Sequence, residues 1–308
     1  MTTLLCTHEA CLKHDTGRHH PESPARLRAV LDGLSGPGFA ALVRREAPRA
    51  ALADLGRAHA PRFVDELLAA IPTQGHGAID ADTIVSPGSG EAALRAAGAV
   101  VAAVDAVIAG EATTAFCAVR PPGHPAERAR AMGFCLFNNI AVGARHAREV
   151  RGLERVAAID FDVHHGNGTQ AIFADDPHLF YGSTHQWPLY PGTGGRGETG
   201  VGNIVNAPLR PMAGSAEFRD AMNELILPAL EDFRPDLIMI SAGFDAHRAD
   251  PLAQLNLVEA DFAWVTERLM DCAARHCRGR VVSSLEGGYD LEALAASAAA
   301  HVAALMAA

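Results

Sequence analysis

Short β-branched or apolar runs alternate with longer helical patterns along the chain after residue 110. Such alternation is typical of repeated βα units around a largely parallel sheet flanked by helices. The runs predict strands at Thr114–Val119, Val156–Phe161, Leu179–Ser183, Leu237–Ala242 and Val281–Leu285. Apolar positions at helical spacing predict helices at Pro24–Leu34, Gly90–Ala109, Asn138–Arg148, Ala216–Phe233, Glu259–His276 and Leu291–Met306. Because no stretch reads as a linker, we expect one doubly wound α/β domain over residues 1–308.

The composition is typical of a globular protein. With 308 residues, 49% of them hydrophobic, the chain can bury a sizeable core. Its first residues lack the basic and apolar regions of a secretion signal, and no segment has about 18 uninterrupted apolar residues. We therefore expect a cytoplasmic protein without membrane contact. The six cysteines form no Cys-x-x-Cys pair, which predicts that most of them are reduced core residues.

The formal net charge of −10 argues against a nucleic-acid-binding surface. It is compatible with a cationic substrate or partner. Neither the charge nor the composition defines an oligomeric state.

The most polar segments directly follow the predicted strands. In open α/β sheets, ligands bind beyond the carboxyl ends of the strands, so functional residues are expected there. These segments read RPPGHPAE (120–127), DFDVHHGNG (160–168), STHQWPLYPGTG (183–194), SAGFDAH (241–247) and LEGGYD (285–290). The long segment from His185 to Gly202 is rich in glycine and proline, which favours a binding loop over a flexible tether.

Asp160, Asp162 and His164 alternate at the end of one predicted strand. If the strand continues through them, their side chains point to one face. Asp245, at the end of another strand, would supply a further ligand. Two carboxylates, one imidazole and an open position for water form a donor set that suits catalytic zinc. On spacing alone, a strand-end turn beside a packed histidine is an equal alternative.

Together and in this order, the motifs resemble those of the histone deacetylase superfamily, which includes class II-like deacetylases, acetylpolyamine amidohydrolases and acetoin-utilisation proteins. The resemblance extends from HPESPARL (20–27) to EGGYDL (286–291), and RAMGFCLFNN (130–139) and ISAGFDAH (240–247) make it specific. It implies an arginase-like α/β fold with its active site at the carboxyl ends of the strands. It also implies a zinc-dependent amidohydrolase that removes an acetyl or related acyl group from acyl-lysine or an acylated polyamine.

The resemblance assigns roles to individual residues. Asp162, His164 and Asp245 would hold one Zn²⁺ per chain, and Tyr289 would donate a hydrogen bond to the substrate carbonyl. Asp160 would orient a histidine of the RPPGHPAE loop. Without the resemblance, Tyr289 would be interpreted as a packed core tyrosine.

A potassium ion close to the zinc is implied as well. The residues that match its site are Asp160, Phe161, Asp162, His164, Ser183 and Thr184. Arg26 matches an arginine beside an internal channel beneath the metal, although a surface salt bridge is its ordinary alternative.

The family binds the acyl-lysine chain in a narrow apolar tunnel. Gly133, Phe134, Tyr190 and Leu252 fall on the tunnel-wall positions. Tyr190 departs from the usual phenylalanine and makes one wall more polar. Asp82 falls at the rim, where it would hydrogen-bond the substrate backbone, or it is an ordinary surface aspartate beside a helix.

Pro125 is the main departure from the family pattern. Most members carry two adjacent histidines after the RPPG turn, whereas this chain has His124 and Pro125. Proline has no proton to give, so one histidine must take a proton from the attacking water and return it to the leaving amine, unless a bound water helps. We predict that His124, paired with Asp160, is this acid-base residue. Asn167, which would orient the missing histidine, is left without its partner.

This departure leaves a second hypothesis open, a zinc-containing binding protein with reduced catalysis. The enzyme is favoured because the metal ligands and Tyr289 are intact, while one acid-base group contributes only ~10²–10⁴-fold to the rate. A third interpretation is a binuclear manganese ureohydrolase on the same fold. It is disfavoured because two metals need further carboxylates, and Gly166 stands where such an enzyme would place a ligand.

Overall fold

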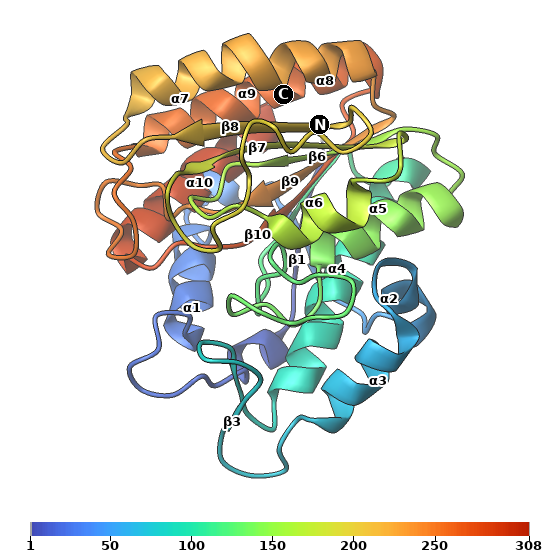
Figure 1. The fold of residues 1–308 in the computed structure, drawn as a ribbon, viewed down its shortest axis with the longest axis vertical. Helices are drawn as coiled ribbons and strands as arrows, with labels where there is room; N and C mark the ends of the chain where they lie inside the picture. Colours follow the sequence, from blue (N-terminus) through green and yellow to red (C-terminus); the bar gives the residue numbers. More distant parts are fainter. Residues whose placement is uncertain (1, 308) are drawn as a thin grey trace.

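The computed structural model describes residues 2–307 and has a central sheet of eight strands between two layers of helices (Figure 1). All neighbouring strands in this sheet are parallel, in the order β2-β1-β5-β10-β9-β6-β7-β8. The strands are β1 (Thr3–Thr7), β2 (Val43–Glu46), β5 (Thr114–Cys117), β6 (Val156–Asp160), β7 (Leu179–Gln186), β8 (Ile204–Leu209), β9 (Leu237–Ala242) and β10 (Val281–Leu285). A separate antiparallel pair is formed by β3 (Gly77–Ala78) and β4 (Ile84–Val85). The predicted α/β fold with a mostly parallel sheet is confirmed.

Helices cover both faces of the sheet. They are α1 (Pro24–Gly33), α2 (Leu52–Ala58), α3 (Pro61–Ala69), α4 (Ser89–Ala109), α5 (Asn139–Glu149), α6 (Asn167–Phe173), α7 (Ser215–Ala221), α8 (Leu227–Phe233), α9 (Glu259–His276) and α10 (Leu291–Ala307). Figure 1 shows α7, α8 and α9 on one side of the sheet and α4, α5 and α6 on the other. Contacts of α10 with α1 and α9 complete the first layer, and contacts of α5 with α2 and α4 complete the second.

Most predicted elements have the expected position, with shifted ends. β9, β10 and α9 match their predicted bounds, whereas β7 continues to Gln186 and takes the first two residues of the predicted binding loop. The helix predicted over Ala216–Phe233 is interrupted by a π-helical turn at Met222–Ile226. Pro228 has no amide hydrogen to donate to the Glu224 carbonyl, which favours a wider turn there.

α4 is a long and apolar helix. By length and composition alone it could cross a membrane, but 72% of its most apolar 18-residue window is buried inside the protein. It packs against β1, β5, β10 and α5. Core packing therefore accounts for its apolar character. All six cysteines are buried and free, in agreement with the predicted reduced core residues.

Candidate active site

The sheet brings together, at the carboxyl ends of its strands, the polar segments that follow them. β6, β9 and β10 are parallel, with β9 in the middle, so their carboxyl ends lie side by side. Asp162 and His164 follow β6, Asp245 follows β9, and Tyr289 follows β10. The segment after β5 brings His124 to the same end of the sheet.

Asp162, His164 and Asp245 form a compact cluster of metal-ligating groups. His164 Nδ1 lies 3.0 Å from Asp245 Oδ2 and 3.2 Å from Asp162 Oδ1. One ligand atom from each of the three residues lies within 4.8 Å of the others. Both carboxylates are buried, with 1% of each residue exposed. The structure thus places the three predicted metal ligands together.

Two glycines allow the backbone to approach these carboxylates. A Cβ at Gly243 would lie 1.9 Å from Asp162 Oδ2, and a Cβ at Gly287 would lie 2.2 Å from Asp245 Oδ2. The Gly287 amide donates to Asp162 Oδ2 at 2.8 Å. Glycine is therefore required at both positions by the space that the carboxylates occupy.

The charges of this cluster fit a bound cation. Burial and the neighbouring Asp162 carboxylate raise the pKa of Asp245 to about 7. Two buried carboxylates this close repel each other, so a cation held between them would be stabilising. Two oxygen donors and one imidazole nitrogen suit a zinc ion with a position left for water or substrate.

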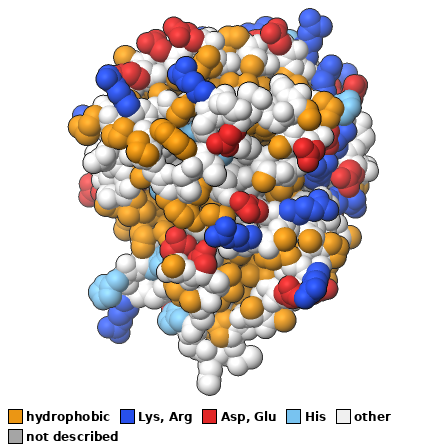
Figure 2. Space-filling view, viewed as in Figure 1, with side chains coloured by type: hydrophobic (Ala, Val, Ile, Leu, Met, Phe, Trp, Pro, Cys, Tyr) orange, Lys and Arg blue, Asp and Glu red, His pale blue; other side chains and the backbone are white. Residues whose placement is uncertain are grey.

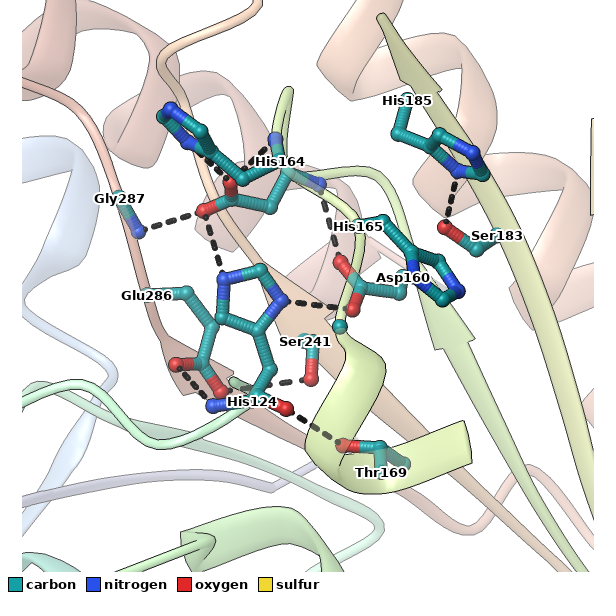
Figure 3. Close-up of polar contacts among 12 residues, drawn as sticks. His124, Asp160, His164, His165, Thr169, Ser183, His185, Ser241, Glu286 and Gly287 are labelled. Atoms are coloured by element: carbon teal, nitrogen blue, oxygen red, sulfur yellow. Dashed lines mark hydrogen bonds and ion pairs between the residues drawn. The ribbon is translucent and has the colours of Figure 1, made fainter. Parts of the chain in front are cut away.

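His124 lies between the metal cluster and Asp160, as Figure 3 shows. Its Nδ1 is 2.9 Å from Asp160 Oδ2, and its Nε2 is 3.5 Å from Asp162 Oδ2. Burial favours the neutral ring, but the Asp160 and Asp162 carboxylates raise the pKa of His124 well above its usual value. Asp160 also accepts a hydrogen bond of 2.9 Å from the Tyr181 hydroxyl, which fixes its position.

Glu286 is a buried residue of the site that the sequence reasoning missed. Its Oε2 accepts hydrogen bonds from the amides of Gly123 at 2.6 Å and His124 at 3.2 Å, and its Oε1 accepts one from Ser241 at 3.3 Å. Burial raises the pKa of Glu286 to about 7. A glutamate directly after a buried strand, ahead of two glycines, was the signal that could have identified it. Glu286 fixes the backbone that carries His124.

Asn167, the residue expected to orient a second histidine, has a side-chain oxygen without a hydrogen-bond partner in the described part of the chain. Asn167 Nδ2 donates to Glu127 Oε1 at 2.7 Å, but Asn167 Oδ1 is buried and has no hydrogen-bond partner within residues 2–307. The Pro125 ring lines the cavity beside His124. A buried acceptor without a donor is costly, and here it lies where the partner of a second histidine is expected.

A cavity of about 260 Å³ leads to the cluster. Besides His124, His164, Tyr289 and Pro125, it is lined by all the predicted tunnel residues, namely Asp82, Gly133, Phe134, Tyr190 and Leu252. Pro122, Cys135 and Leu189 also line it and were not predicted. A Cβ at Gly133 would lie 3.2 Å from both the Tyr190 ring and Pro125, so the wall is tight at this point.

Tyr289 is held by aromatic and cationic neighbours. Its ring centroid is 5.9 Å from that of Phe134 and 4.8 Å from the Arg26 guanidinium carbon. Burial raises the pKa of Tyr289 well above its usual value, so the hydroxyl remains a hydrogen-bond donor. Arg26 is buried, donates to the backbone carbonyls of Glu286 and Gly288, and pairs with the buried Glu22 carboxylate, so it does not form a surface salt bridge.

The residues matched to a potassium site lie on neighbouring strand ends. Asp160 in β6 is in register with Ser183 in β7, and Thr184 is the next residue of β7. The Ser183 hydroxyl is 2.9 Å from His185 Nδ1. Phe161, Asp162 and His164 belong to the segment that follows β6.

Known proteins are similar to this chain in sequence and fold. The family model for the histone deacetylase domain matches residues 20–305. The histone deacetylase-like amidohydrolase of Pseudomonas aeruginosa is 42% identical, covering 91% of this chain and 80% of that protein. Human polyamine deacetylase HDAC10 is 39% identical, covering 96% of this chain and 47% of that protein. The crystal structure of the HDA15 HD domain has a TM-score of 0.94 at 35% identity, covering 99% of this chain and 88% of that chain. The chain therefore belongs to the histone deacetylase superfamily.

Proposed function

We propose that this chain is a zinc-dependent amidohydrolase that removes an acetyl or related acyl group from acyl-lysine or an acylated polyamine. The observation that carries the proposal is the placement of His124. Its Nδ1 contacts Asp160 at 2.9 Å while its Nε2 faces Asp162 at 3.5 Å. An acid-base group thus lies beside the candidate metal ligands, at the buried end of a cavity walled by Phe134 and Leu252.

Each residue of the site has a separate role in the proposed reaction. When bound by Asp162, His164 and Asp245, a zinc ion supplies Lewis acidity to a carbonyl and lowers the pKa of water. His124 Nε2 accepts a proton from the attacking water, and the Asp160 carboxylate stabilises the resulting imidazolium. The Tyr289 hydroxyl donates to the carbonyl oxygen as negative charge develops there. His124 then returns the proton to the amine nitrogen as the C–N bond breaks.

His124 serves both proton transfers because Pro125 has no titratable group. The carboxylates that raise the pKa of His124 favour its role as base. They also make the imidazolium a poorer acid toward the leaving amine. A bound water is the alternative donor. We therefore expect a slower chemical step than in a site with two histidines.

The cavity supports a substrate with a long aliphatic chain. The rings of Phe134 and Tyr190 and the side chain of Leu252 provide apolar walls for methylene groups. Asp82 contributes a carboxylate to the cavity lining, which suits a substrate backbone amide or a second ammonium group. One relative named above is called a polyamine deacetylase, which favours testing acetylated polyamines beside acetyl-lysine.

We also infer a structural potassium ion close to the zinc. The carboxylates of Asp160 and Asp162, the Ser183 hydroxyl and the backbone carbonyls of Phe161, His164 and Thr184 would hold it. These hard oxygen donors suit an alkali cation better than a transition metal.

The second candidate function is a zinc-containing binding protein with reduced catalysis. The unpartnered Asn167 Oδ1 favours it, because this atom is where a second histidine would be expected to donate a hydrogen bond. The intact pair of His124 and Asp160 favours the enzyme, since a single acid-base group is worth ~10²–10⁴-fold.

A side-by-side kinetic comparison separates the two functions. The zinc-loaded protein is assayed on acetyl-lysine peptides, trifluoroacetyl-lysine peptides and acetylated polyamines. An amidohydrolase turns over at least one class, and its activity disappears in His124→Ala. If none of the three substrates is hydrolysed while the protein binds zinc, the binding protein is the better description.

A further inference from the structure

A second group of metal-ligating side chains lies between α8 and α9, outside the cavity. Glu231 belongs to α8, and Cys272 and His276 belong to α9. Cys272 and His276 are four residues apart, so they lie on one face of α9, one turn from each other. One ligand atom from each of the three residues lies within 4.8 Å of the others.

The three side chains differ in burial in a way that suits a site open to solvent on one side. Cys272 is 1% exposed, whereas the side chains of His276 and Glu231 are 20% and 34% exposed. α8 lies at the upper edge of Figure 1, and at the same edge Figure 2 shows acidic and basic side chains at the surface. An ion can therefore reach the group from solvent and rest against the buried thiol.

The ligand atoms lie close enough together for a single ion to contact all three. His276 Nε2 lies 2.6 Å from Glu231 Oε2. Zinc bonds of about 2.0–2.3 Å place neighbouring ligand atoms roughly 3.3–3.8 Å apart, so small side-chain rotations would admit the ion. Arg275 pairs mainly with Glu231 Oε1, and its contact with Oε2 is longer, at 3.5 Å, so a metal at Oε2 would have to replace only this weaker contact.

The donor set selects the kind of metal. Thiolate and imidazole favour zinc, cobalt or copper over magnesium and calcium. The Cys272 thiol faces the same Glu231 carboxylate that Arg275 and His276 contact, so all three donors converge on one point. Burial and the Glu231 carboxylate raise the pKa of Cys272 to about 12, so the metal must displace the thiol proton. Three donors from two helices leave the fourth position to water.

We propose that Glu231, Cys272 and His276 form a second transition-metal site that ties α8 to α9. Binding of a divalent ion releases the thiol proton and any proton shared by His276 and Glu231, with no change of oxidation state. This ion is additional to the single zinc that the sequence predicts for the catalytic cluster. The site does not depend on the proposed deacetylase function.

A titration of the metal-free full-length protein with Co²⁺ tests the site. Asp162, His164 and Asp245 offer only oxygen and nitrogen, so a thiolate-to-cobalt charge-transfer band distinguishes a cysteine-containing site from these three ligands. The band should stop growing once one cobalt ion per chain is bound through the thiolate. It should persist in Asp245→Ala. Addition of Zn²⁺ should abolish it.

Variants make the assignment specific. Cys272→Ser should lose the band, and the matched variant Cys277→Ser should keep it, because Cys277 is also buried but bonds the Arg280 carbonyl. His276→Gln should weaken cobalt binding by more than the ~10–100-fold that loss of an outer hydrogen-bond partner costs. His276 is partly exposed, so this variant remains informative if Cys272→Ser does not fold. The absence of the band in the wild type, or its persistence in Cys272→Ser, would overturn the proposal.

Discussion

Tyr289 contributes a single hydroxyl to the proposed chemistry. Tyr289→Phe keeps the ring that packs against Phe134 and Arg26, so the fold and the zinc content should not change. Loss of one oxyanion donor should lower kcat by ~10²–10³-fold. Steady-state kinetics beside metal analysis measures both effects. Wild-type turnover in this variant would show that Tyr289 has only a structural role.

Pro125 determines how many histidines the site has. Pro125→His would give the buried Asn167 Oδ1 a donor and restore an acid for the leaving amine. We expect kcat/KM on an acetyl-lysine substrate to rise at least ~10-fold, within the range that a positioned acid-base group supplies. His124→Ala in the unmodified chain should abolish most activity, because no second imidazole replaces it.

Loss of proline also frees the backbone, which could misplace the new side chain. A crystal structure of Pro125→His is therefore the control for unchanged activity. If the introduced imidazole hydrogen-bonds Asn167 and kcat/KM still does not rise, Pro125 is not what limits the reaction.

At the scale of elements, Glu286 connects the end of β10 to the segment after β5. Glu286→Ala leaves the amides of Gly123 and His124 without their acceptor, at a cost of ~1–3 kcal/mol each. The free energy of unfolding and kcat should both fall, because His124 loses its support. Glu286→Gln retains one acceptor oxygen and should lose less of each. Wild-type stability and kcat in the alanine variant would contradict this role.

The elements show which sequence patterns predict structure. β9 and β10 match their predicted bounds because continuous apolar runs are typical of central parallel strands. β1, β2 and β8 were missed. β2 and β8 are edge strands, whereas β1 is an interior strand whose apolar run, residues 4–6, is only three residues long. All four residues of β2 are exposed, and β8 contains Pro208, which an edge strand tolerates.

The residues of the candidate site were easier to predict than the outer strands of the sheet. The alternation of Asp160, Asp162 and His164 at the end of one strand, and Asp245 at the end of another, indicated the metal donors. The family resemblance added the role of Tyr289. The role of Glu286 depends on a hydrogen bond across 163 residues of chain. The unpartnered Asn167 oxygen depends on its surroundings in three dimensions. Neither the Glu286 hydrogen bond nor the unpartnered Asn167 oxygen produces a local pattern in the sequence.

For the whole molecule, buried histidines link stability to pH. Burial lowers the pKa of His301 to about 3, between Thr266 and Ser283. The unfolded chain binds a proton near pH 6.5 and the folded chain does not, so His301 contributes stability above pH 6.5 that is lost as pH falls toward 3. The difference in unfolding free energy between wild type and His301→Asn should therefore shrink by ~2 kcal/mol from pH 7 to pH 5. Denaturant titrations at both pH values measure it, and a constant difference would show that His301 is not neutral in the fold.

Dependence of amide hydrolysis on the metal is the most direct test of the proposed enzyme. Chelation should abolish activity on the best of the acetyl-lysine and acetylpolyamine substrates, and one equivalent of Zn²⁺ at the catalytic cluster should restore it. Asp245→Ala that remains folded should lose this zinc and stay inactive when zinc is added, because a buried ligand is missing. Restoration by zinc in the wild type alone is the expected result. Undiminished hydrolysis in the chelated protein, or in Asp245→Ala, would contradict a zinc-dependent mechanism at this site.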